Sequence, residues 1–419
     1  MGRRRSRFGV VGRLEPEGTA HLLYNGTQTR IQAAMDSLTI SNLLRDEALR
    51  RREFPVCENK VFLAHAGVSP LPRRVAETMN QYLESASRDN QENSLSDAAI
   101  RETRALAARL IQVQPEEIAF VGSTSMGLAM VAAGLPWEPG DQIVCYRDDY
   151  PANVYPWMDL ARRGAVVRFV EPTQFGNVTV EDVERVLDRR TRLVSLASVH
   201  FQSGWRLEVD QIGKFLRERG ILFCLDGIQS FGALRTSAEF VDFAAADAHK
   251  WLLGPLGTAI LCVRREHFDR FHPPLVGWQN ALNPDFIAQD SLVFKPDARR
   301  YEPGSLNLAG IIGLQAALHL ILECGMEAVE TRVLALARQI IGLATRAGLT
   351  VVGPTTGPGL SGIVSLLNES GDMTKIHSRL NAAGIVSSLR HTRDGRKCLR
   401  LSPHFYIRDE ELPDLSEFF

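Results

Sequence analysis

The sequence predicts an α/β fold in which a mostly parallel sheet of seven strands is flanked by helices. Downstream of Pro115, short apolar runs alternate with stretches that have the spacing of amphipathic helices, which is typical of successive βαβ units. Two apolar runs, residues 221–225 and 243–246, are followed at once by the carboxylates Asp226 and Asp247. Because ligands of open α/β sheets bind beyond the carboxyl ends of the strands, these two runs also predict where a site lies.

The segments expected around this sheet follow the chain in order. Residues 1–34 are polar and aperiodic, so we expect a disordered extension, with Met35 as an alternative start of the protein. Helical spacing is found in residues 75–85, 98–111, 128–133, 180–187 and 209–217. The strands of the sheet are expected at residues 117–121, 142–146, 165–170, 192–197, 221–225, 242–246 and 258–263.

The last third of the chain predicts a smaller α+β domain. Long helices are expected from residue 305 and over residues 327–347, and a shorter helix over residues 373–383. The strands expected among them are residues 350–352, 362–367, 385–389 and 399–402. Residues 273–302 are rich in Pro, Gly and Asn, which indicates a surface segment that we place near a subunit contact. We therefore expect a large domain over residues 73–304 and a small domain formed by residues 35–72 and 305–419.

The composition excludes several classes of function. The 419 residues are 45% hydrophobic and carry a formal net charge of −1, so no broad attraction to nucleic acid or to a membrane surface is expected. No apolar run approaches the ~18 residues that a membrane span needs, and the basic start lacks the apolar core of a signal peptide. The six cysteines are scattered without metal-ligand spacing, which favours a cytoplasmic enzyme with reduced thiols and no metal.

Lys250 is the first candidate for catalysis. It follows the second apolar run in the stretch Asp247-Ala248-His249-Lys250-Trp251. An amine beside an apolar strand end is costly unless it loses its charge or finds a partner, and this suits a lysine that forms a Schiff base. The alternative interpretations are a surface lysine for residue 250 and a helix cap for Asp226.

Asp226, Gln229, His249 and Lys250 together resemble the cofactor-binding core of class V aminotransferases. This family of pyridoxal-phosphate (PLP) enzymes includes cysteine desulfurases and isopenicillin N epimerase. The resemblance implies fold type I of the PLP-dependent transferases, with Lys250 holding PLP as an internal aldimine and moving the proton of the substrate Cα. It also implies that Asp226 faces the pyridine nitrogen, that Gln229 binds the phenolic oxygen, and that His249 contacts the phosphate.

Two further segments match the phosphate-binding parts of the family. Residues 120–127 pass from a strand through a small polar loop into a helix, whose start favours an anion. Thr124 and Ser125 match the family's phosphate-binding pair, although a Ser/Thr helix cap has the same appearance. Ser305, in a segment similar to the family's Arg-x-Glu-x-Gly-Thr-x-Asn, is expected to reach the phosphate of the partner subunit. The resemblance therefore implies a homodimer with shared active sites.

The remaining site residues are also implied by the resemblance. Tyr150 stands where desulfurases and the epimerase carry a ring-stacking histidine, and a tyrosine can still stack on the pyridine face; packing at a domain boundary is its alternative. His200 or Gln202 would serve at the turn where relatives place an amide near the phenolic oxygen. His65, after an apolar run, is a candidate substrate contact or a loop histidine.

Two arginines are candidates for binding the substrate. Arg400 matches the arginine of the small domain that clamps the substrate α-carboxylate through a bidentate pair. Arg390 has a similar place in many members of the family. For both residues the alternative is a solvated charge at the end of a strand.

The expected reaction is that of an amino-acid aminotransferase. The alternatives within the family are C–S lyase or cysteine-desulfurase-like activity and epimerisation, and a non-catalytic scaffold is the alternative of a different class. A desulfurase needs a nucleophilic cysteine on a mobile loop, and residues 391–397 contain none. Cys398 follows at once, but it belongs to an expected strand, where the two-residue period puts it on the same face as Arg400.

Overall fold

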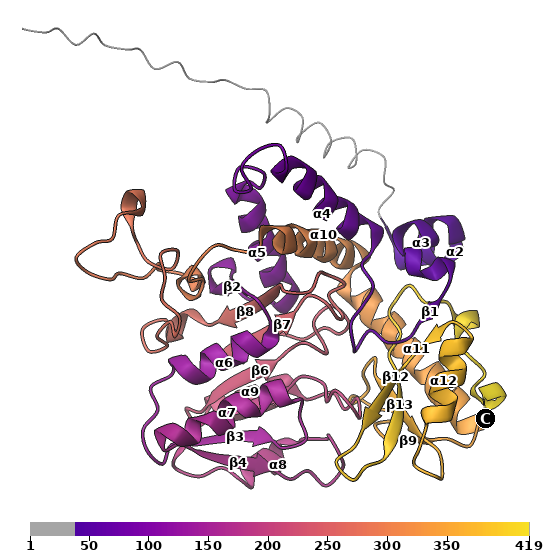
Figure 1. Cartoon of the computed structure of the whole chain (residues 1–419). Coiled ribbons are helices and arrows are strands. Elements are labelled where there is room, and N and C mark those ends of the chain that lie inside the picture. The colour runs from indigo at the N-terminus through magenta and orange to yellow at the C-terminus, as the bar shows by residue number, and fades with distance from the viewer. Residues whose placement is uncertain (1–37, 419) are drawn as a thin grey trace, which may run out of the picture. The chain divides into compact units, whose positions relative to one another are not determined.

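A computed structural model describes residues 38–418 of the chain (Figure 1). The predicted extension over residues 1–34 and the alternative start at Met35 lie outside the described residues. Near its beginning the described chain forms two short helices, α2 (Ile40–Arg45) and α3 (Glu47–Glu53).

The central sheet has seven strands in the order β2-β8-β7-β6-β5-β3-β4. β8 runs antiparallel to its neighbours β2 and β7, and the other pairs are parallel, which confirms the mostly parallel sheet. The strands are β2 (Ile118–Val121), β3 (Gln142–Tyr146), β4 (Val166–Val170), β5 (Thr191–Ala197), β6 (Leu222–Asp226), β7 (Phe243–Asp247) and β8 (Ala259–Val263). Each was predicted to within two residues, because buried strands are short apolar runs that end at polar turns.

Helices cover both faces of this sheet (Figure 1). The helices of the large-sheet region are α4 (Arg73–Ala86), α5 (Asp97–Ile111), α6 (Thr124–Gly134), α7 (Tyr155–Asp159), α8 (Val180–Glu184), α9 (Val209–Arg217) and α10 (Leu308–Cys324). Phe223 and Leu225 of β6 pack in one apolar core with α5, α9 and α10, whereas Leu222 and Cys224 pack in another with α6 and α7. This division follows from the alternation of side chains along a strand.

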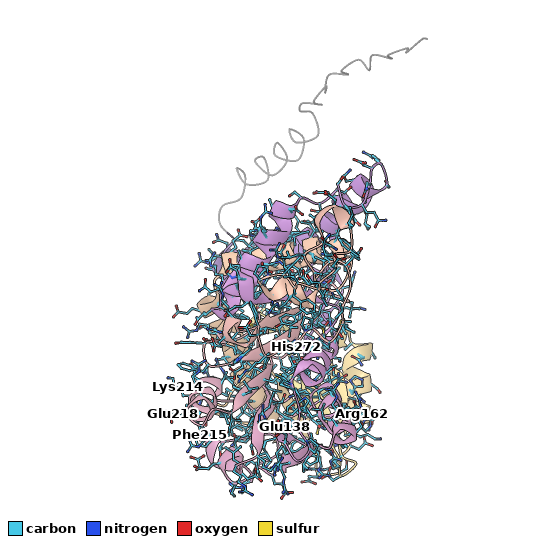
Figure 2. All side chains as sticks on the ribbon, turned by 90° about the vertical axis from the view of Figure 1, so that its left-hand side faces the viewer. Glu138, Arg162, Lys214, Phe215, Glu218 and His272 are labelled. Atoms are coloured by element: carbon cyan, nitrogen blue, oxygen red, sulfur yellow. The ribbon has the colours of Figure 1, made fainter. Side chains whose placement is uncertain are left out.

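The helix α9 shows how a local pattern determines burial. Ile212 and Leu216 of this helix are buried in the core, whereas Lys214 and Glu218, at the end of the helix, are exposed on the outer side (Figure 2). The apolar stripe faces the sheet because burying it removes its surface from water.

A second, antiparallel sheet of four strands has the order β12-β13-β10-β9. Its strands are β9 (Thr350–Val351), β10 (Val364–Leu367), β12 (Ser388–His391) and β13 (Lys397–Leu401). The helices α11 (Met326–Arg346) and α12 (Thr374–Ala382) contact this sheet. The predicted strand over residues 385–389 is in fact two strands that separate at Ser387, because β11 (Ile385–Val386) pairs with β1 (Val61–Phe62) and β12 pairs with β13. The domain boundaries proposed above stay a prediction.

No single helix among residues 38–418 is long and apolar enough to cross a membrane. The pair α10 and α11 reaches the required length and apolarity only when both helices are counted, and it bends by 82° between them.

Candidate active site

Several of the predicted site residues lie at one edge of the central sheet. Asp226 and Asp247 are the last residues of β6 and β7, and the turns that hold Tyr150 and Gln202 follow the parallel strands β3 and β5. Because these strands run in the same direction, their carboxyl ends place four chain segments around one volume.

Lys250 lies in a tight turn directly after β7. The Leu253 N–H donates to the Lys250 carbonyl (3.1 Å), and Leu253 adopts a left-handed backbone with φ 57°. The amine lies over the ring of Tyr150, 5.4 Å from its centroid. Burial lowers the pKa of Lys250 to about 8, although the Asp226 carboxylate opposes this change. The site therefore holds an amine that loses its proton far more readily than an exposed lysine.

Asp226 is buried at the end of β6 and accepts a hydrogen bond from the Ile228 N–H (3.0 Å). Burial raises its pKa to about 6, while the Ile228 N–H and the charge of Lys250 act in the opposite direction. No arginine forms an ion pair with this carboxylate within residues 38–418. Such a carboxylate is well suited to a cationic N–H donor from a ligand.

Gln229 links the two strand ends to the N-terminal part of the described chain. Its Nε2 donates to the Ala66 carbonyl (3.1 Å), and its Oε1 accepts from the Trp251 indole N–H (2.9 Å). These bonds hold the turn that carries Lys250, and the predicted contact with a phenolic oxygen stays a prediction.

The start of α6 is built against the end of β7. A Cβ atom on Gly127 would lie 2.8 Å from Ala245 Cβ, so the glycine allows helix and strand to approach closely. Asp247 Oδ2 accepts from both the Thr124 N–H (2.7 Å) and the Thr124 hydroxyl (2.9 Å). Both Thr124 donors are therefore bound to Asp247, and the helix cap itself is Ser123, which accepts from the Met126 N–H (3.1 Å). This arrangement favours a structural link between α6 and β7 over a phosphate contact by Thr124.

Ser125 and His249 remain the donors at this end of the site. Ser125 is exposed in the first turn of α6, where N–H groups lack partners within the helix. His249 Nδ1 is buried and lies 3.4 Å from Asp247 Oδ1. Because this contact lacks hydrogen-bond geometry, Nδ1 has no hydrogen-bond partner among the described residues. An unsatisfied buried nitrogen beside a helix start fits an anionic ligand.

The turn after β5 holds His200 and Gln202, the two alternative residues proposed to lie near the phenolic oxygen. Their hydrogen bonds distinguish between them. His200 Nδ1 accepts from the Ser203 N–H (3.1 Å), and Nε2 lies 2.9 Å from the Asp148 carbonyl, to which it donates. Burial lowers the pKa of His200 to about 4, so the ring is neutral and has no nitrogen left for a cofactor. Gln202 is also buried, but within the described part of the chain its Nε2 has no partner. The geometry favours Gln202.

Arg400 lies fully buried on β13, with Nη1 donating to the Phe201 carbonyl (2.6 Å). Its Nε and Nη2 have no hydrogen-bond partner in residues 38–418. Arg390, on the adjacent β12, is half-buried and donates from Nη1 to the Leu389 carbonyl (3.0 Å). Burial and the neighbouring Arg390 charge lower the pKa of Arg400 to about 9. Two guanidinium groups with free donors fit a carboxylate ligand.

The arrangement of His65 favours packing over a substrate contact. Its Nδ1 lies 3.0 Å from the Ser402 carbonyl and its Nε2 lies 2.8 Å from the Tyr406 hydroxyl, and the side chain is fully buried. Burial therefore lowers the pKa of His65 well below its ordinary value.

Ser305 is exposed, as a residue that reaches a partner subunit must be. The segment before it is firmly held, because Glu302 is buried, pairs with Arg104 (2.7 Å) and accepts from the Phe120 N–H (2.7 Å). The partner contact itself stays a prediction.

Asp149 is a residue of the site that was not among those predicted from the sequence. This buried carboxylate accepts from Tyr150 N–H (3.3 Å), Asn153 Nδ2 (3.1 Å) and Ala197 N–H (3.0 Å), so it anchors Tyr150 to β5. Burial and the negative charge of Asp226 raise its pKa to about 7. Its position in the sequence could have indicated this role, because Asp149 follows the end of β3 much as Asp226 and Asp247 end β6 and β7.

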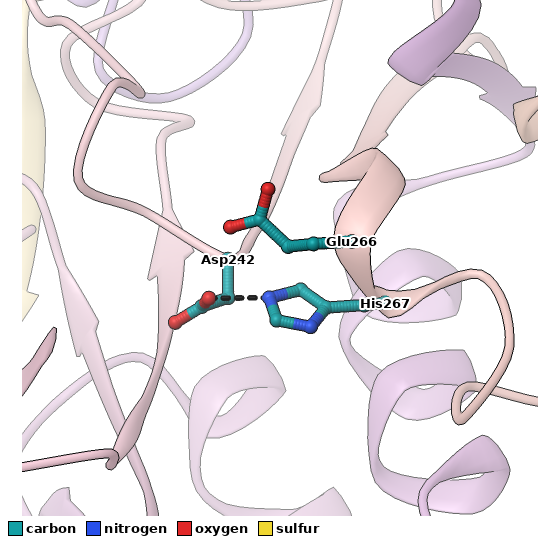
Figure 3. Close-up of side chains that lie close together, drawn as sticks. All are labelled: Asp242, Glu266 and His267. Carbon is teal, nitrogen blue, oxygen red and sulfur yellow. Dashed lines mark hydrogen bonds and ion pairs between the residues drawn. The ribbon is translucent and has the colours of Figure 1, made fainter.

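One group of side chains resembles a metal site away from this edge. Asp242, Glu266 and His267 lie close together (Figure 3), and His267 Nε2 donates to Asp242 Oδ1. Arg270 donates to His267 Nδ1 (3.1 Å from Nε), so Nδ1 must stay unprotonated. A metal on Nε2 of a neutral histidine needs the proton on Nδ1, which Arg270 opposes. We interpret this group as a structural contact that connects the residue before β7 to the short helical turn after β8.

The residues at the sheet edge fit PLP, which combines a pyridine ring, an aldehyde and a phosphate. The unpaired buried Asp226 suits a protonated ring nitrogen, and the poorly charged Lys250 suits the aldehyde. Ser125 and His249 Nδ1, which has no hydrogen-bond partner among the described residues, suit the phosphate.

Comparisons with known proteins agree with this geometry. Residues 61–412 match the family model described as Aminotransferase class-V. Probable cysteine desulfurases from Methanothermobacter thermautotrophicus and Pyrococcus abyssi are 29% and 31% identical, each over 67% of this chain and 71% of the relative.

Solved structures show the same fold. The apo cysteine desulfurase of Thermococcus onnurineus has a TM-score of 0.81 at 24% identity, covering 92% of this chain and 97% of that one. A cystine C–S lyase in complex with cysteine persulfide has a TM-score of 0.76 at 24% identity, covering 87% and 97%.

Proposed function

This chain belongs to the aminotransferase class-V family, and we propose that it is a PLP-dependent enzyme that breaks the Cβ–S bond of a cysteine-type amino acid. The observation that carries the proposal is the likeness to two probable cysteine desulfurases, one of them 31% identical. This likeness favours C–S cleavage over the transamination expected from the sequence.

We assign the cofactor contacts to Lys250, Asp226, His249 and Ser125, with Tyr150 against the ring. PLP supplies an aldehyde that condenses with amines and a protonated ring that withdraws electrons from the substrate Cα. Asp226 keeps the ring nitrogen protonated because a buried carboxylate stabilises a cationic N–H. Gln229 and Asp149 position the turns that carry these groups.

The protein's own residues then bind and deprotonate the substrate. Arg400 binds the α-carboxylate through its free Nε and Nη2. The Lys250 amine, whose pKa is lowered to about 8, takes the Cα proton and delivers it to the departing sulfur. The balanced reaction of cysteine with water gives pyruvate, ammonia and sulfide.

We further propose that the reaction is a lyase reaction and not a transfer of sulfur to a protein thiol. Residues 391–397 contain no cysteine. Cys398 is buried within β13, and burial raises the pKa of its thiol. A buried neutral thiol fixed in a strand is a poor nucleophile.

The proposed assembly is a cytoplasmic homodimer with shared active sites. Ser305 is exposed and follows Pro303, whose carbonyl accepts a hydrogen bond from the Gln279 N–H (3.3 Å) of the apolar arm, residues 275–293. This arm projects at the left of the view in Figure 1. Its exposed apolar side chains are Leu275, Val276, Trp278, Leu282, Phe286, Ile287, Leu292 and Val293. Apolar exposure on this scale favours a protein partner, and the free buried cysteines suit a reducing compartment.

The test is product analysis with the purified holoenzyme. We expect L-cysteine or L-cystine, without any keto acid, to yield pyruvate and ammonia in equal amounts together with sulfide or persulfide. Lys250→Ala should form neither product. Alanine as the carbon product would show sulfur transfer instead, and turnover that requires a keto acid would show transamination; either result contradicts the lyase proposal.

A further inference from the structure

A cavity of about 290 Å³ opens beside the start of α9. It is lined by residues 206–211 and 235–237, together with Ser198 and Pro358, and by none of the residues assigned above to PLP or to the substrate. Its volume is close to the ~300 Å³ at which small-molecule sites begin. The cavity is therefore large enough for a ligand of its own.

Two segments offer unused hydrogen-bond donors to this cavity. The N–H groups of Asp210 and Gln211, in the first turn of α9, have no hydrogen-bond partner among residues 38–418. The Thr236 hydroxyl also has no partner in this part of the chain, although the residue is only 9% exposed. Because buried polar groups are normally hydrogen-bonded, these donors indicate a ligand with acceptor oxygens.

The arginines of the cavity carry more charge than the carboxylate that binds them. Glu330 of α11 is buried and accepts from Arg206 Nη1 (2.6 Å) and from Arg235 Nε (2.5 Å). The Nη1 and Nη2 groups of Arg235 have no partner within the described residues. One positive charge is left over, and the start of α9 adds the positive end of its dipole. This part of the cavity favours an anionic group.

Two carboxylates give the rest of the lining the opposite charge. Glu208 and Asp210 are exposed, and neither forms an ion pair in the described part of the chain. They oppose a ligand that carries only negative charge, such as phosphate, and they favour a cationic group at the opening. A small zwitterion combines the two requirements, and a free α-amino acid is such a molecule.

One loop connects this cavity to the candidate active site. The Leu207 N–H donates to the Ser198 carbonyl (2.9 Å), which closes residues 198–207 into a loop whose two ends line the cavity. At the tip of the same loop, the Phe201 carbonyl accepts from Arg400 Nη1 (2.6 Å). A ligand that fixes the ends of the loop therefore restrains the group that supports Arg400.

We propose that this cavity is an effector site for a free amino acid. The carboxylate of the effector binds Thr236, Arg235 and the N–H groups at the start of α9. Its ammonium group faces Glu208 and Asp210, and its presence favours ligand binding at the active site by restraining the loop that supports Arg400. The effector site rests on the proposed function only in treating the active site as one that binds carboxylates.

The first test measures binding to the holoenzyme by calorimetry, with the N,N-dimethyl derivatives of alanine, serine and leucine as probes. Their tertiary amines cannot condense with an aldehyde, and the background substitution Arg400→Gln removes carboxylate binding at the active site. Derivatives with an amide in place of the carboxylate should bind more than about tenfold weaker, and N-acetyl derivatives, which lack the cation, about threefold weaker. Thr236→Val should weaken the zwitterions about fivefold and Arg235→Gln about tenfold.

The matched control is Arg217→Gln at the other end of α9, where the guanidinium donates to the Glu239 carbonyl (2.8 Å). This variant should bind the probes as the parent protein does, and thermal stability is compared for every variant. If Thr236→Val binds the probes as tightly as its parent, the cavity does not hold them and the inference is overturned. Tighter binding of inorganic phosphate than of every zwitterion overturns it as well.

A second arm separates the effector site from the proposed reaction. Aminooxyacetate condenses with the bound cofactor and contains no C–S bond, so the visible absorbance reports its association rate whether or not sulfur compounds are cleaved. Saturating probe should raise this rate about fivefold in the unchanged holoenzyme and should not raise it in Thr236→Val. Equal rates with and without probe, together with C–S cleavage, overturn the effector site and leave the proposed function standing.

Discussion

At the scale of the residue, the protonation state of the Lys250 amine controls whether it can react with an aldehyde. Burial holds the pKa of this amine at about 8, well below the ordinary value of 10.5. Only the free amine reacts with an aldehyde. A lowered pKa therefore increases the reactive fraction at neutral pH, and that fraction rises as the pH passes through the pKa.

We accordingly expect the rate at which the apoprotein takes up PLP to rise with pH and to be half-maximal near pH 8. Stopped-flow measurement of the visible absorbance follows this rate. Lys250→Ala should show only slow, reversible binding at every pH. A half-maximal rate near pH 10 would mean that the amine is exposed and would contradict the buried position.

Cys398 provides a second prediction at this scale. Because its thiol is buried and its pKa is raised by burial, we expect Cys398→Ser to keep pyruvate formation within about threefold of the unchanged protein. Activity is compared at equal cofactor content. A loss of several orders of magnitude with the cofactor retained would assign sulfur transfer to this thiol.

At the scale of the element, the segment that leads to Ser305 depends on one buried ion pair. Glu302 connects this segment to β2 through Arg104 and the Phe120 N–H. Removing one partner leaves the other buried without compensation.

We expect Glu302→Ala to lower the free energy of unfolding by about 3–5 kcal/mol in urea denaturation. The control is Arg162→Ala, which breaks an exposed pair with Asp159 and should cost less than about 1 kcal/mol. An equal effect of the two substitutions would show that the Glu302 pair contributes no more than a surface contact.

At the scale of the whole molecule, the apolar arm and Ser305 predict a dimer. We expect light scattering to give twice the mass of the chain, and the double substitution Trp278→Glu with Phe286→Glu to give monomers that retain less PLP. Met158→Glu, an exposed apolar residue of α7 outside the arm, is the control and should stay dimeric. A monomer with full PLP content would contradict the shared site.

The sequence by itself determined the seven strands of the central sheet. It also determined that Asp226 ends β6 and that Lys250 follows the carboxyl end of β7. These features are local, because an apolar run that ends in a polar turn already defines a buried strand and its edge. Only the tertiary structure decided how Thr124, His65 and His200 are used, because each is bound by a residue distant in the sequence or by its own turn.

The tertiary structure also decided the pairing of β12 with β13, which brings Arg390 beside Arg400. The charge of each arginine is evident from the sequence. Whether a carboxylate compensates that charge depends on all the chain segments that meet around it, and no local pattern contains that information.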